Sequence, residues 1–156
     1  IVEMLNAFHE GEEMYLPYTT ERLRSRVCRA PRQYSWSNLW LTEGAVAGGW
    51  PSGESIAGRF TGADGVVEEA RETNILDYGC LPGHEDELLG LLRAWCGYTA
   101  DRGWQDVLIF SSQGSRSLPI IGQLEAALSA FDFWTPRLPE PPGAAYRGLY
   151  VDPIYF

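Results

Sequence analysis

The stretch 72–112 constrains the fold of this chain most strongly, because two strand-like segments flank one amphipathic helix. Residues 73–78 have the composition of a strand, and a Pro-Gly turn at 82–83 follows them. Gly103 is placed to end the helix, and the unbroken apolar run 107–110 predicts a buried central strand. The helix carries apolar or small residues on one face, at helical spacing: Leu88, Leu91, Leu92, Trp95 and Thr99. This order predicts a βαβ unit whose two strands are parallel neighbours.

The rest of the chain predicts further helices and strands around this unit. Helices are expected over 1–11 and 19–30, then a β-hairpin over 34–50 and a loop with one short strand near 59–61. After the unit, a helix is expected from Pro119 to Phe131, followed by strands at 131–134 and 147–152. Residues 1–156 therefore read as a single domain of the α/β (α+β) class. We expect a mixed, mostly antiparallel sheet with one parallel βαβ pair at its centre, flanked by about four helices.

Composition narrows the classes of function. A net charge of -9 argues against binding to nucleic acid or to an anionic membrane surface, since both need a basic face. Three cysteines without a CxxC spacing and only two histidines support neither a disulfide framework nor a structural metal site. No apolar run reaches the length of a membrane span, and no leader sequence precedes the first helix. A cytoplasmic protein without a bound metal is the expectation.

The predicted order of elements resembles the GNAT superfamily of N-acetyltransferases over nearly the whole chain. Residues 148–153 are similar to the family's closing strand, and residues 6–11 with 16–19 look like the opening of the C-terminal half of tandem GNAT proteins. The resemblance implies transfer of an acetyl group from acetyl-coenzyme A to an amine substrate. It also implies another GNAT domain as a partner, in tandem or as a dimer. GNAT domains usually begin with a strand, and none precedes Ile1 here, so a neighbouring segment or an upstream domain is expected to supply it.

The loop that binds the coenzyme pyrophosphate in this family is altered. The family has an arginine or glutamine and two small residues where this chain has Gly83, Asp86 and Leu88. Residues 85–87 place three carboxylates in the first turn of the helix, where the helix dipole supplies only about half a positive charge. A pyrophosphate would be repelled there, so backbone near the strand end is left to contact the cofactor. The resemblance then implies these cofactor-binding positions: Tyr78, Gly79, Cys80, Gly83 and His84.

Catalytic residues are not marked by a motif. The family's tyrosine, which protonates the departing thiolate, corresponds to Leu128, and a leucine cannot transfer a proton. The candidates that remain for acid/base work are Asp77, Tyr78, His9, His84 and Tyr150, and Asp77 and Tyr150 are the favoured pair. His9 is otherwise expected to be a hydrogen-bonding helix residue, and Cys80 a packing residue. Two hypotheses stay open: an acyl-coenzyme A-dependent N-acetyltransferase with an atypical loop, and a catalytically silent domain that binds a partner or a small ligand.

Overall fold

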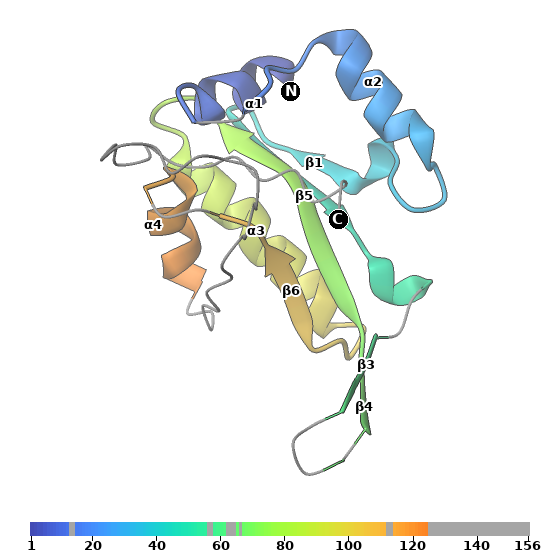
Figure 1. Ribbon diagram of the computed structural model, residues 1–156. Helices are drawn as coiled ribbons and strands as arrows, with labels where there is room; N and C mark the ends of the chain where they lie inside the picture. Colours follow the sequence, from blue (N-terminus) through green and yellow to red (C-terminus); the bar gives the residue numbers. More distant parts are fainter. Residues whose placement is uncertain (13–14, 56–57, 62–64, 66, 112–113, 125–156) are drawn as a thin grey trace, which may run out of the picture.

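A four-stranded mixed sheet forms the centre of the fold, with strand order β1-β2-β5-β6. The computed structural model describes residues 1–12, 15–55, 58–61, 65, 67–111 and 114–124 (Figure 1). The strands of the sheet are β1 (Leu39–Leu41), β2 (Ala45–Trp50), β5 (Glu72–Cys80) and β6 (Asp106–Ile109). A separate antiparallel hairpin of β3 (Gly58–Thr61) and β4 (Val67–Ala70) projects from the end of the sheet where β5 begins (Figure 1). The predicted fold class is confirmed.

Four α-helices accompany the strands among the described residues: α1 (Val2–His9), α2 (Thr20–Arg29), α3 (Glu85–Ala100) and α4 (Ser117–Ile121). Helix α2 begins where predicted, because the Thr19 side chain accepts a hydrogen bond from the Arg22 N–H at 3.1 Å and caps the helix. Helix α3 is followed by Gly103 at φ +67°, a conformation that glycine adopts without strain. None of the helices in the described ranges is long and apolar enough to cross a bilayer.

Strand β5 runs parallel to β6 and antiparallel to β2, as the predicted βαβ unit requires. Its pairing with β6 covers only Glu72 to Ile75. Opposite β2, Ile75 pairs with Gly49 and Asp77 pairs with Gly48, so Leu76 is an extra residue in β5. Such a β-bulge bends a strand and changes the direction of the side chains that follow. The pairing with β6 therefore ends where β5 bends.

Two apolar clusters pack on opposite faces of the sheet. On one face, Leu88, Leu92 and Trp95 of α3 pack with Ala47 and Ile75. On the other face, residues of α1 and α2 pack with the strands: Leu5, Leu23, Val27, Val46 and Leu76. The five helix residues that the periodicity placed on one face of α3 are all buried. The predicted phase of this helix is confirmed.

Some predictions need correction or lie outside the described residues. Residues 36–38 form a short 3-10 helix (Trp36–Asn38) where the hairpin was expected to begin, because Asn38 and Ser35 bond each other in a capping box. The predicted loop at 52–65 contains a second 3-10 helix (Ser52–Glu54) and β3. The helix predicted from Pro119 appears as α4 and a third 3-10 helix (Gly122–Leu124), and the rest of its predicted length lies outside the described residues. The strands predicted at 131–134 and 147–152 lie beyond the described ranges, within which β6 is the outermost strand of the sheet.

The substitution Leu92→Ala tests the packing of α3. Leu92 is fully buried, so we expect the free energy of unfolding to fall by about 2–5 kcal/mol in urea denaturation. Gly90 is a matched control on the exposed face of the same helix, where an added Cβ meets no atom within 4 Å. Gly90→Ala should stabilise the protein by roughly 0.5–1 kcal/mol through helix propensity. Equal effects of the two substitutions would contradict this orientation of α3.

Candidate functional site

The carboxyl ends of β5 and β6 form the candidate site, because α/β proteins place ligands where parallel strands end. The Leu81 N–H donates to the Gly44 carbonyl at 2.8 Å, next to the β2–β5 ladder. Backbone groups alternate in direction along a strand, so the amides and carbonyls of Tyr78 and Cys80 point away from β2. This is the side on which the β5–β6 pairing has already ended at Ile75. The edge of β5 beyond the bulge is therefore without a strand neighbour among the described residues.

A buried histidine of α1 occupies part of this edge. The His9 Nε2 lies 2.9 Å from the Tyr78 carbonyl oxygen, and its Nδ1 lies 2.6 Å from a carboxylate oxygen of Glu12. A carbonyl and an ionised carboxylate only accept hydrogen bonds, so both ring nitrogens of His9 face acceptors. Burial opposes ionisation of Glu12, but the hydrogen bonds from His9 and Ser115 outweigh it and hold the Glu12 pKa below its ordinary value.

Serine hydroxyls connect this pair to the segment after β6. The Ser115 hydroxyl donates to Glu12 at 2.5 Å and lies 2.8 Å from the Ser117 hydroxyl, which in turn lies 2.7 Å from that of Ser111. In a catalytic triad the serine bonds the imidazole, which then bonds the carboxylate. Here the carboxylate lies between serine and histidine, so the arrangement cannot activate a serine. It links α1 to the chain that leaves β6.

Two of the predicted cofactor-contacting residues are covered by protein. A Cβ at Gly79 would lie 2.9 Å from Phe8 Cβ and 3.0 Å from the Met4 carbonyl oxygen, so α1 packs directly on this glycine. Burial, together with the nearby carboxylates of α3, raises the pKa of the Cys80 thiol to about 11. Cys80 is thus a neutral packing residue and not a nucleophile at neutral pH, as expected from the sequence.

The acidic first turn of α3 binds backbone amides of its own chain. Glu85 accepts a hydrogen bond from the Gly83 N–H at 3.3 Å, and Glu87 accepts one from the Gly44 N–H at 3.0 Å. His84 lies against the turn between β1 and β2, since a Cβ at Gly44 would lie 2.1 Å from its Nδ1. That Nδ1 is 2.7 Å from Glu87. Carboxylates therefore occupy the start of α3 and bond the backbone amides there.

Glu87 is the acid most strongly affected by these contacts. Hydrogen bonds from the Thr42 hydroxyl, then from His84 and from the Gly44 N–H, lower the pKa of Glu87 to about 2. Each of these groups bonds the ionised form, which explains the direction of the shift. Glu87 thus joins the start of α3 to the β1–β2 turn, a role that its place in an acidic run did not indicate.

Asp77 lies on the opposite face of the sheet, under α2. Its carboxylate accepts hydrogen bonds from the hydroxyls of Tyr18 at 2.5 Å and Tyr34 at 2.7 Å, and from the Arg26 Nε at 3.0 Å. The Asp77 side chain is fully buried. Three donors around a buried carboxylate indicate a structural anchor, and no acid/base chemistry follows from this geometry. The bulge at Leu76 turns Asp77 toward these partners.

The predicted site residues therefore fall into three groups. Tyr78, Gly79 and Cys80 lie together near the end of β5, with the Tyr78 hydroxyl donating to the Phe110 carbonyl at 2.6 Å. Gly83 and His84 lie in the loop before α3, and Asp77 faces α2. Tyr150 lies outside the described residues.

The sequence analysis did not identify Glu12 or Ser115 as site residues. The spacing of three residues between His9 and Glu12, at the end of α1, could have indicated their contact. Within the described ranges, no three histidine, cysteine or acidic residues gather as ligands for a metal.

Asp77→Asn tests the buried anchor. An asparagine of the same shape loses the charge that faces Arg26 and brings N–H donors toward hydroxyls that already donate. Breaking a buried pair from one side costs about 3–5 kcal/mol, which we expect to see as a lower free energy of unfolding in urea. The exposed Asp106 provides the control, since Asp106→Asn should change stability by no more than about 0.5 kcal/mol. If Asp77→Asn leaves the free energy of unfolding unchanged, Asp77 is not a structural anchor.

Glu87→Gln tests the acidic turn through pH. A lowered pKa in the folded state means that Glu87 stabilises the fold above its ordinary pKa of 4.5, and that this stabilisation is lost as the pH falls toward about 2. Thermal unfolding across this window should show the wild type more stable than Glu87→Gln at pH 6, with the difference shrinking as the pH falls. A difference that stays constant down to pH 2 would show that the ionised form is not favoured.

Comparison with known proteins identifies no relative: the chain matches no known protein family, no curated protein and no solved structure.

Proposed function

We propose that this chain is a GNAT-like domain that binds acetyl-coenzyme A and transfers the acetyl group to an amine. The observation that carries the proposal is the edge of β5 beyond Leu76, where the bulge ends the pairing with β6. The pantetheine arm of coenzyme A contains two amides, and an amide chain can add to the edge of a strand through main-chain hydrogen bonds. Backbone from Tyr78 to Gly83 would hold this arm.

The chemistry requires little more than placement. The neutral amine nitrogen attacks the thioester carbonyl carbon and the carbon–sulfur bond breaks; the new amide nitrogen loses one proton and the departing thiolate takes one. Asp77 already accepts hydrogen bonds from Tyr18, Tyr34 and Arg26, so Tyr150 is the candidate that remains for supplying this proton. The three cysteines are free thiols, which supports a reducing compartment such as the cytoplasm.

A catalytically silent domain is the second candidate, and a specific set of contacts favours it. His9 already bonds the Tyr78 carbonyl, and carboxylates already bond the amides of Gly83 and Gly44. A ligand that needs these groups would have to displace contacts within the protein. Under this proposal the domain pairs with another GNAT domain, or binds a small ligand elsewhere.

Calorimetric titration with acetyl-coenzyme A separates the two candidates. Glu85 and Asp86 are exposed, and each charge near a helix N-terminus is worth about 0.3–1 kcal/mol, so the double variant Glu85→Gln/Asp86→Gln should bind acetyl-coenzyme A roughly 3- to 30-fold more tightly than the wild type. The variant leaves Glu87 in place because that residue supports the fold. Arginine at Gly83 or glycine at Leu88 would be poor alternatives, since Gly83 has φ +84° and Leu88 is fully buried.

The outcomes are distinct. Micromolar binding by the wild type, about -8 kcal/mol, would support the enzyme and contradict the repulsion argument. Binding by the variant alone would support the site and the repulsion together. If neither protein binds and the wild type associates with a separate GNAT domain in sedimentation, the silent domain is favoured.

A further inference from the structure

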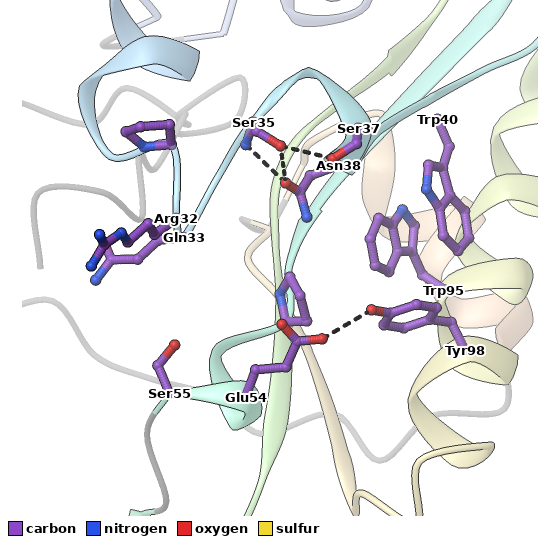
Figure 2. Close-up of a pocket in the computed structure, with 12 residues that line it drawn as sticks. Arg32, Gln33, Ser35, Ser37, Asn38, Trp40, Glu54, Ser55, Trp95 and Tyr98 are labelled. Carbon is purple, nitrogen blue, oxygen red and sulfur yellow. Dashed lines mark hydrogen bonds between the residues drawn. The ribbon is translucent and has the colours of Figure 1, made fainter.

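A second concave site lies at the β1 edge of the sheet, whereas the proposed thioester site lies on the β6 side of β5. A cavity of about 330 Å³ lies between the turn after α2, the first 3-10 helix, the segment after β2, and α3 (Figure 2). Pro51 lines it and follows Trp50, which pairs with Asn74 near the start of β5. Volumes of this size are typical of small-molecule sites. The cavity is therefore separate from the carboxyl end of β5.

The cavity has one aromatic wall. Trp40 and Trp95 stack with ring centres 3.9 Å apart and ring planes 10° apart, and the ring of Tyr98 meets both edge-on. Trp95 is fixed further because its Nε1 donates to the Ala47 carbonyl at 3.2 Å. Rigid aromatic side chains lose little entropy when a ligand packs on them. This wall is therefore suited to contact with an apolar or aromatic part of a ligand.

Two charges of opposite sign stand on other sides of the cavity. Arg32 makes no hydrogen bond or ion pair with any residue of the described ranges. Glu54 is 54% exposed at its side chain; one oxygen lies 3.4 Å from the Tyr98 hydroxyl and 3.9 Å from the Arg102 Nε. Its second oxygen has no partner in the part of the chain that the structure describes. A cation and an anion are thus both available to one ligand.

One further donor is fixed in direction. The Asn38 Oδ1 accepts hydrogen bonds from the Ser35 N–H at 2.8 Å and from the Ser35 hydroxyl at 2.9 Å. Since an N–H can only donate, this side of the amide must be the oxygen, and the Nδ2 is turned the other way. Figure 2 shows this nitrogen turned away from Ser35, toward the side of the cavity where Glu54 lies. The amide is therefore held ready to donate to a ligand.

From this arrangement we propose that the cavity binds a free amino acid or a similar small zwitterion. The carboxylate of the ligand would bind Arg32 and the Asn38 Nδ2, and its ammonium would bind the second oxygen of Glu54, beside the Tyr98 hydroxyl. The ligand side chain would pack against Trp40 and Tyr98, which favours an aromatic amino acid. A neutral sugar also suits aromatic walls, but it would leave both charges of the cavity without a partner.

Titration of the chain with the proteinogenic L-amino acids tests the proposal, with tryptophan fluorescence and calorimetry as readouts. L-phenylalanine should saturate with a dissociation constant on the order of 100 µM. Phenethylamine lacks the carboxylate and 3-phenylpropanoate lacks the ammonium, so each should bind about tenfold more weakly or worse. Glucose should not bind.

Single substitutions then assign each charge to its partner group. Arg32→Gln should weaken L-phenylalanine about tenfold and leave phenethylamine unchanged, because phenethylamine has no carboxylate to lose. Glu54→Gln should weaken L-phenylalanine similarly and leave 3-phenylpropanoate unchanged. The exposed residues Arg24 and Glu10 provide controls of equal charge change, and Arg24→Gln and Glu10→Gln should bind as the wild type does.

Several results would overturn the proposal. These are the absence of saturation by every amino acid at about 10 mM, glucose binding as tightly as L-phenylalanine, and equal weakening of phenethylamine and L-phenylalanine by Arg32→Gln. Unchanged thermal unfolding of the variants would show that a loss of binding is not a loss of fold. Acetyl-coenzyme A binding at the far end of β5 is measured separately, so failure of one site does not decide the other.

Discussion

Strand β5 carries one residue more than its partner β2 between the pairs Ile75–Gly49 and Asp77–Gly48, and much of the structure depends on this bulge. Before it, β5 has a strand on both sides, and after it, only β2 remains beside β5 among the described residues. The bulge also turns Asp77 toward α2, while Tyr78 and Cys80 pack with the α3 side of the sheet. A single inserted residue thus places the buried anchor on one face, at the point where the β5–β6 pairing ends.

Ionised carboxylates join distant parts of this acidic chain. Asp77 holds α2 and the tyrosine-bearing segments to β5, Glu12 joins α1 to the segment after β6, and Glu87 joins α3 to the turn before β2. Each accepts hydrogen bonds from at least two groups, so desolvation of the charge is offset locally. These contacts also limit function, because a carboxylate that already accepts hydrogen bonds within the protein is a poor ligand or proton carrier. The acidic residues at the start of α3 therefore have a structural role in these contacts.

The βαβ unit was predictable because helix and strand periodicities are local properties of the sequence. The bulge was not, since residues 73–78 look like one regular strand and only pairing with β2 shows that Leu76 is extra. Long-range partners were equally hidden: Tyr18 and Tyr34 reach Asp77 from 59 and 43 residues away, and Ser115 reaches Glu12 from 103 residues away. The predicted cofactor positions near the end of β5 do lie together, but the cavity beside Arg32 and Glu54 is built from four separate segments and has no motif.

The stacked pair of Trp40 and Trp95 has an optical consequence. Two indoles held nearly parallel at 3.9 Å couple electronically, and here one belongs to β1 and the other to the buried face of α3. A coupled pair of this kind contributes a distinct circular dichroism band near the indole transitions, which vanishes when the rings separate. The protein thus carries, without any label, a chromophore that reports on the contact between one helix and the sheet.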